Sequence, residues 1–288
     1  LSALMMGKYY SQVVWTYGKA KQPKPYTDPS PTIAGLLAEA GVASAAYPAL
    51  GQISEEYGLG RGFTEPAKRT NGAAKIVSAI VERVRKGAPQ GLFVYSHMME
   101  PHHPYRGPGS TDLERYESEV AAVDRALGPL LDLALDSELA SRIALVVSAD
   151  HGEAFGEHAS TQHGTTLYEE LMRVPLFVHL PGQAPGTSSA AVSLVDVGPT
   201  ILDMFGVATP SSFMGESFLP VVRGEQLTLT RPLILESGRK MRALIVDDRW
   251  KYIRDDRHGT TELFDLTRDP LELEDLHATL PERTAEMA

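Results

Sequence analysis

The sequence predicts an α/β fold: a doubly wound, mostly parallel sheet flanked by helices, followed by a small antiparallel β subdomain. Helical and strand-like patterns alternate as far as Gly206, and no internal repeat of solenoid or propeller length is present. After about Thr230 the pattern changes to short runs with period two. Parallel strands need helical crossovers, whereas short alternating runs form hairpins. We therefore expect an α/β domain over residues 1–226 and an antiparallel hairpin subdomain over residues 227–288.

The first part of the chain has a β-α-β rhythm. Ser30 and Pro31 form an N-cap and first-turn pair for a helix, and Gly41 supplies the left-handed residue that ends it. A second helix begins near Asn71. Short apolar runs suit strands that are covered on both faces. Such strands are expected over residues 42–47 and 91–95.

The clearest helix lies between about Thr111 and Leu135, because apolar residues recur there at steps of three and four. The recurring residues are Leu113, Tyr116, Val120, Val123, Leu127, Leu130 and Ala134. The remaining elements of the α/β part are strands over 142–149 and 176–180 and a helix over 197–205 that ends at Gly206. The hairpin strands are expected over 232–236, 241–246, 250–254 and 261–265.

Composition excludes several classes of protein. The 288 residues are 43% hydrophobic and 22% charged, which is typical of a globular protein with a large core. The net charge of −10, without a long basic run, argues against nucleic-acid binding. No run approaches the ~18 apolar residues of a membrane helix, so no span is expected in this segment. The absence of cysteine excludes disulfides, thiolate metal sites and a cysteine nucleophile within it.

Histidines gather in one stretch of the chain. Six of the nine fall between residues 97 and 163, where an even spread would put about two. His97 and His102 follow one predicted strand, and Asp150 with His151 follows another. Since ligands bind outside the carboxyl ends of parallel strands, this cluster lies where a site should form.

Asp150 and His151 have the character of metal ligands. A carboxylate oxygen beside a neutral imidazole nitrogen favours Mn, Zn or Fe over a calcium or magnesium site made only of oxygens. Gly152 would let the backbone turn closely around the bound group. The alternative is structural: Asp150 would cap the next helix and His151 would be a buried, hydrogen-bonded histidine.

Several motifs, in order, resemble the sulfatases of the alkaline phosphatase superfamily. The longest similarity consists of two neighbouring stretches. They are Ser148-Ala-Asp-His-Gly-Glu-Ala-Phe-Gly-Glu-His158 and His163-Gly-Thr-Thr-Leu-Tyr-Glu-Glu-Leu-Met-Arg-Val-Pro-Leu176. Glu100-Pro-His-His-Pro-Tyr105 is similar to the family's Asp-Pro-His-x-Pro-Tyr turn, with Glu100 in place of Asp. Further similarities lie at Tyr116 to Gly128, Asp196-Val-Gly-Pro-Thr200, Glu262-Leu-Phe-Asp-Leu266 and Asp269-Pro270. The resemblance implies an alkaline-phosphatase-like α/β fold.

The resemblance also implies a reaction, in which a covalent nucleophile held against a divalent cation hydrolyses a sulfate or phosphate ester. Asp150 and His151 match the family's downstream metal-ligand pair. His102 matches a histidine that contacts the ester or its leaving group, and His163 stands where many sulfatases have a lysine that reaches a substrate oxygen. His97, Glu153 and His158 are open between a role in support of the site and a structural one.

The family's nucleophile precedes a helix that ends in Leu-x-Thr-Gly-x-Tyr, which Leu4-Met-Met-Gly-Lys-Tyr9 resembles. Counting back from Gly7 places the nucleophile just ahead of Leu1, together with the upstream metal-binding aspartates. We therefore expect an amino-terminal segment to be missing and this chain, expressed alone, to be inactive. By the same count Leu1 occupies the arginine of the formylglycine motif Cys-x-Pro-x-Arg, which favours a serine or threonine nucleophile.

Three interpretations follow from the resemblance. The leading one is a sulfatase-like, metal-dependent hydrolase of sulfate esters on a small molecule or a glycan. The second is a phosphodiesterase or phosphoethanolamine-type transferase of the same superfamily, and the third is a non-catalytic remnant of the fold. Calcium fits a sulfatase site made only of oxygens, whereas Mn or Zn fits phosphate chemistry with an imidazole ligand. Family analogy favours a periplasmic or extracellular location.

Overall fold

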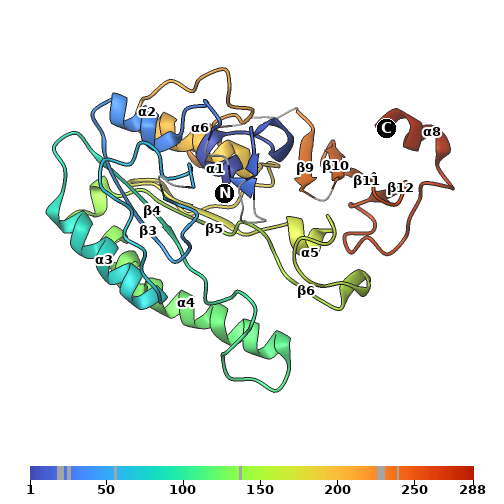
Figure 1. Ribbon diagram of the computed structural model, residues 1–288, viewed down its shortest axis with the longest axis horizontal. Coiled ribbons are helices and arrows are strands. Elements are labelled where there is room, and N and C mark those ends of the chain that lie inside the picture. The colour runs from blue at the N-terminus through green and yellow to red at the C-terminus, as the bar shows by residue number, and fades with distance from the viewer. Residues whose placement is uncertain (18–22, 25–26, 55–56, 136–137, 226–230, 239) are drawn as a thin grey trace.

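The computed structural model describes residues 1–17, 23–24, 27–54, 57–135, 138–225, 231–238 and 240–288, so the predicted domain boundary at 226/227 lies outside the described residues. Figure 1 shows helices on both sides of the strands β3, β4 and β5, with the C-terminal sheet β9–β12 at the far end of the molecule. The helices α3 and α4 lie on one side, and α1, α2 and α6 lie on the other. This layering is the α/β architecture that the sequence predicts.

The predicted β-α-β unit is present. Strands β3 (Ala43–Pro48) and β4 (Leu92–His97) pair in parallel, with Ala45 opposite Val94. The crossover between them includes helix α3 (Ala73–Lys86), which packs its apolar face on both strands. The positions of these elements agree with the predicted ones to within two residues, because their periodic apolar patterns are long and unbroken.

The second strand pair departs from the prediction. Strands β5 (Leu145–Ser148) and β8 (Leu176–His179) run antiparallel, where the sequence analysis places both in a mostly parallel sheet. The connection between them holds a short hairpin, β6 (Ala154–Phe155) and β7 (Thr161–Gln162), and one helical turn, α5 (Glu169–Met172). This connection has no long crossover helix, so the chain returns in the opposite direction.

Two helix starts also differ from the expected ones. Helix α2 (Ile33–Glu39) is capped by Thr32, whose Oγ1 accepts a hydrogen bond from the Gly35 amide at 3.1 Å, and not by Ser30. Ser30 instead lies in a turn held by Asp28. Helix α6 (Leu194–Met204) begins three residues earlier than predicted, because Ser193 and Asp196 form a capping box.

Helix α4 (Asp112–Leu135) has the predicted length but only part of its apolar stripe is covered. Leu130 and Ala134 are buried near its C-terminal end, whereas Leu113 and Val120 are 45% and 42% exposed. The predicted helix is therefore confirmed, and its apolar stripe is covered mainly near the C-terminal end. Periodicity shows which face is apolar, but it does not show how far the neighbouring element extends.

The C-terminal part is an antiparallel sheet in the order β12-β11-β10-β9, as the period-two runs predict. Its strands are β9 (Leu233–Ser237), β10 (Met241–Val246), β11 (Trp250–Asp255) and β12 (Thr260–Asp265), and helix α8 (Pro281–Met287) follows them. The other elements are α1 (Ser2–Met6), α7 (Leu219–Val222), the two-residue strands β1 (Thr16–Tyr17) and β2 (Pro23–Lys24), and the single 3-10 turns η1 (Tyr10–Gln12), η2 (Ala140–Arg142) and η3 (Glu157–Ala159).

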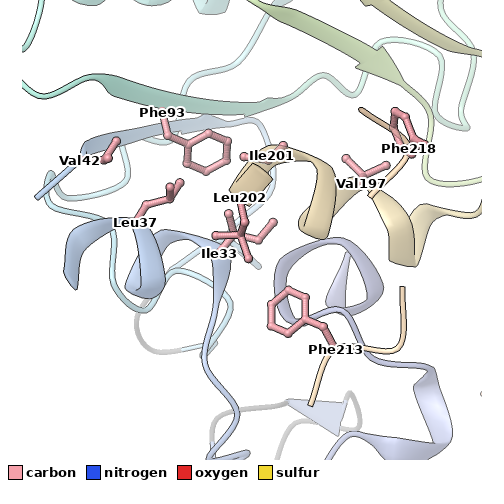
Figure 2. Packing of buried hydrophobic residues seen from close by; sticks show 9 residues of the cluster. All are labelled: Ile33, Leu37, Val42, Phe93, Val197, Ile201, Leu202, Phe213 and Phe218. Carbon is pink, nitrogen blue, oxygen red and sulfur yellow. The ribbon is translucent and has the colours of Figure 1, made fainter. Parts of the chain in front are cut away.

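The largest core cluster joins α2, α6 and strand β4 (Figure 2). Leu37 and Leu202 are fully buried and face each other's helices, and Phe93 from β4 lies beside them. Phe213 and Phe218 close the cluster from the segment that follows α6. This packing fixes the strand from which the site's first histidine projects. No helix in the described ranges has both the length and the hydropathy to cross a bilayer.

Leu202→Ala should lower the free energy of unfolding by about 2–5 kcal/mol, because it removes a fully buried side chain from a rigid helix interface. Leu273→Ala is the matched control, since Leu273 is 76% exposed and its loss should cost less than about 0.5 kcal/mol. Urea denaturation followed by circular dichroism measures both. Equal losses for the two variants would contradict the core described above.

Candidate functional site

The histidine cluster gathers at the carboxyl ends of β4 and β5. His97 is the last residue of β4, and Asp150 follows β5 by two residues. The Nε2 atom of His97 lies 3.6 Å from Oδ2 of Asp150, so the two strand ends meet through these side chains. The structure thus brings a carboxylate and an imidazole that follow or end separate strands to one place.

The hydrogen bonding of His151 determines which of its nitrogens faces Asp150. Nδ1 of His151 lies 2.8 Å from the carbonyl oxygen of Gly152, and a carbonyl only accepts, so Nδ1 carries the proton. Nε2 then presents its lone pair 3.8 Å from Oδ1 of Asp150. The lone pair of His151 and the carboxylate of Asp150 face the same space. A cation between them would contact both atoms.

The charge state of Asp150 agrees with this reading. Burial alone would raise the pKa of its carboxyl, but the hydrogen bond from His97 and the electrostatic effect of the His151 and His97 rings outweigh burial. The net effect holds the pKa of Asp150 below its usual range. Asp150 is therefore an anion at neutral pH, which is the form that binds a metal ion.

The hairpin β6–β7 places Glu153 beside His163. Its register pairs Ala154 with Gln162, so the next positions outward are residues 153 and 163. Oε1 of Glu153 lies 3.0 Å from Nδ1 of His163, and Oε2 accepts a hydrogen bond of 2.8 Å from the Tyr105 hydroxyl. The Glu153 side chain is only 4% exposed, so both donors satisfy a buried carboxylate. Burial and this hydrogen bond raise the pKa of Tyr105.

The imidazoles form one contiguous group. The ring of His163 stacks on that of His151, with centroids 4.0 Å apart, and meets the ring of His102 edge-on at 5.1 Å. Because Nδ1 of His163 faces Glu153, Nε2 lies on the opposite side of the ring and is free to bind an oxygen atom. Imidazoles at such positions can donate hydrogen bonds or protons to the oxygens of an ester.

Two sequence-based interpretations change at this point. His158 lies away from the group, because its ring contacts Glu170 and the backbone of Glu272. Gly152 is not needed for close approach to a ligand: a Cβ there would lie 2.0 Å from the carbonyl oxygen of Glu170, so glycine lets the chain pack on α5.

Sequence reasoning overlooked Tyr105 and left Glu100 as an unexplained departure from the family turn. Tyr105 ends that turn, and its position in the quoted motif was the only signal that could have identified it. The Glu100 carboxylate accepts hydrogen bonds from the backbone amides of Ala73 and Met99. The longer side chain therefore caps the first turn of α3, a role independent of the site.

The donor set fits part of a metal site. Asp150 and His151 supply one oxygen and one nitrogen ligand on facing atoms, and Nδ1 of His97 is buried without a hydrogen-bond partner. Within the described residues, no group of three or more His, Asp or Glu side chains is arranged to hold a metal ion. These side chains can thus provide two ligands, and the remaining ones must come from other atoms.

Asp150 and the neighbouring imidazoles thus lie together at the strand ends of an α/β layer. The sulfatase family model matches residues 1–207, and a model for the C-terminal part of N-sulphoglucosamine sulphohydrolase matches residues 156–286. Because the first match covers more than half of the chain, the chain belongs to the sulfatase family.

Curated relatives agree with this assignment. Arylsulfatase K of Xenopus laevis is 30% identical over 187 residues, which make up 60% of this chain and 35% of that protein. Choline-sulfatase of Rhizobium meliloti is 29% identical over 168 residues, or 56% of this chain and 32% of that protein. The chain therefore spans about a third of the length of these relatives.

Solved structures confirm the alkaline-phosphatase-like α/β fold. A protein in complex with its substrate D-glucosamine-2-N,6-O-disulfate has a TM-score of 0.76 at 17% identity, covering 99% of this chain and 85% of that chain. The phosphonate monoester hydrolase of Agrobacterium radiobacter has a TM-score of 0.74 at 14% identity, covering 99% of this chain and 83% of that chain. At these identities the likeness concerns the fold alone.

Glu153→Ala should destabilise the protein by about 1–3 kcal/mol for each buried donor that it leaves unsatisfied, namely the Tyr105 hydroxyl and Nδ1 of His163. Glu117→Ala, at an exposed position of α4, should change stability by less than about 0.5 kcal/mol. Urea denaturation of both variants tests this. If the two variants lose the same stability, the Glu153 carboxylate does not hold the turn that carries Tyr105 against the hairpin that carries His163.

Proposed function

We propose that the protein to which this chain belongs is a metal-dependent hydrolase of sulfate esters. The observation that carries the proposal is the facing pair of Asp150 and His151, with the carboxylate-bound imidazole of His163 stacked directly on it. The relatives named above as sulfatases support the reaction class.

Each residue of the group has a proposed task. Asp150 and His151 hold the divalent cation, which when bound offsets the negative charge of the ester oxygens. His97 supports Asp150 through its Nε2 atom. His163, as an imidazolium, donates from Nε2–H to an ester oxygen, while its Nδ1–H donates to Glu153. His102, at the exposed edge of the group, lies where a leaving group would depart and can protonate it.

The proposed substrate is a sulfated sugar or another small sulfate ester. One structural neighbour was solved with a disulfated glucosamine and another with a neocarrahexaose, which makes glycans the first class to test. The acidic net charge argues against a nucleic-acid substrate. For the metal, the imidazole in the donor set favours Mn or Zn, and calcium is the alternative.

The activity test uses the product of the complete gene, because the chain spans about a third of its curated relatives. An aryl sulfate should be hydrolysed, and Asp150→Asn should lower kcat/KM at least roughly 100-fold because it removes a charged metal ligand. His277→Gln, at an exposed C-terminal position, should leave kcat/KM unchanged. Faster hydrolysis of aryl phosphodiesters than of aryl sulfates would favour the phosphoester alternative. Equal activity of Asp150→Asn and the wild type would refute the proposed site.

Metal binding can be measured on the 288-residue chain itself. Substoichiometric Mn²⁺ should broaden the imidazole NMR signals of His151 before those of His277, because paramagnetic relaxation acts over short distances only. Asp150→Asn should remove this preference, since the remaining imidazole is a weak single ligand. Competition with Ca²⁺ or Zn²⁺ ranks the candidate metals. Equal broadening of His151 and His277 would mean that Asp150 and His151 do not bind the ion.

A further inference from the structure

His158 stands at the tip of the β6–β7 hairpin, where the α/β part meets the C-terminal sheet. It adopts a left-handed backbone conformation, with φ 49° and ψ 34°, which a non-glycine residue takes only when its surroundings hold it there. Its ring is 14% exposed and stacks on Tyr168, with centroids 3.7 Å apart and planes 16° from parallel. The Tyr168 ring thus covers one face of the His158 ring.

Both ring nitrogens of His158 face acceptors. Nδ1 lies 3.0 Å from Oε1 of Glu170 in α5, and Nε2 lies 3.0 Å from the backbone carbonyl oxygen of Glu272, beyond β12. Neither a carboxylate nor a carbonyl can donate a hydrogen. A neutral imidazole carries one N–H and satisfies one of these contacts, whereas an imidazolium carries two and satisfies both.

The surrounding charges favour the same form. Lys251, fully buried on β11, lies 2.8 Å from Glu169 and 2.9 Å from Glu272, measured from Nζ to the carboxylate oxygens. Glu170 lies on His158 and Glu262 on Tyr168, so four carboxylates and this one lysine lie around the contact between α5 and the C-terminal part. Tyr168 contributes no charge, because its hydroxyl donates to Glu262 and its pKa is raised. On the hairpin itself Glu157 is exposed and accepts from the Phe155 amide. A second cation at His158 therefore reduces a local excess of negative charge.

We propose that His158 is a positioning residue: held as an imidazolium, it clamps the tip of the hairpin whose other end carries Glu153 and His163. The hairpin is only two residue pairs long, so a displacement of its tip reaches its root. The charge state of His158 is independent of the function proposed above, while its effect on catalysis through His163 rests on that function. The C-terminal sheet thereby acts on the site without contributing a residue to it.

The pH dependence follows from the contacts. Burial by itself would lower the pKa of His158, but the hydrogen bonds to Glu170 and to the Glu272 carbonyl, with the charges of both carboxylates, raise it above the usual 6.5. A raised pKa in the folded state means that the stabilisation is fully present below about pH 6.5 and is lost as the pH rises through the folded-state value. The clamp is therefore closed below about pH 6.5 and opens as the pH rises through the raised folded-state value.

The test is NMR on the 288-residue chain labelled with ¹⁵N-histidine, without metal or substrate. At pH 7.0, where a free histidine is mostly neutral, both ring nitrogens of His158 should show the shifts of a protonated imidazole, and Glu170→Gln should lower the titration midpoint. A neutral His158 ring at pH 7.0 would overturn the proposal. Because neither activity nor metal is measured, a failed sulfatase assay would leave this result untouched.

Two further measurements separate positioning from mere packing. His158→Gln should lower Tm relative to the wild type by more at pH 6 than at pH 9, and it should shift the ring signals of His163. The control is His277→Gln, which removes an exposed histidine paired with Asp275 and should do neither. A Tm loss that is independent of pH, or His163 signals that do not move in His158→Gln, would also overturn the proposal.

Discussion

The burial of the Glu153 carboxylate is the constraint on which the rest of the site depends. A charged group that is 4% exposed must be hydrogen-bonded, and its two partners come from different parts of the chain: Tyr105 from the turn after β4 and His163 from the far strand of the hairpin. Satisfying one carboxylate therefore brings three segments together. The contact of His163 with His151 follows, since the ring has only one orientation that keeps Nδ1 on Glu153.

This constraint also explains how a histidine can serve at position 163, where many sulfatases have a lysine. An ammonium group is a point charge on a flexible stem and tolerates small errors in placement, whereas an imidazole acts only through a nitrogen in the correct orientation and tautomer. Glu153 fixes the orientation of the ring and accepts the Nδ1 proton, so that an imidazolium would present Nε2–H to a substrate oxygen, and the Tyr105 hydroxyl fixes Glu153 in turn. The substitution at 163 is thus intelligible only together with its two buried partners.

The limits of prediction from sequence follow from which interactions are local. Helices α3 and α4, strands β3 and β4 and the C-terminal meander were predictable, because periodicity and turn residues encode them within short windows. The antiparallel direction of β8 and the exposed half of α4 were not, because both depend on contacts with distant segments. In the site, the motif around Asp150 identified four of the grouped residues: Asp150, His151, Glu153 and His163. The clustering of histidines after a predicted strand and the turn at residues 100–105 added His97 and His102. The hairpin register that joins Glu153 to His163 is a property of strand pairing and not of composition.

The C-terminal sheet is best understood as a support for the site. Gly152, at the root of the hairpin, donates its amide to the carbonyl oxygen of Leu171 at 2.7 Å, and α5 in turn meets the sheet through Glu169 and the buried Lys251. Glu272 adds the second contact, and burial raises the pKa of its carboxyl. Separating the sheet from α5 would leave Lys251, Glu169 and Glu272 unpaired or newly hydrated. The hairpin would then lose support at its root, where Gly152 contacts Leu171, and at its tip, where His158 contacts Glu170 and Glu272. The geometry at strands β4 and β5 is consequently supported by residues more than a hundred positions further along the chain.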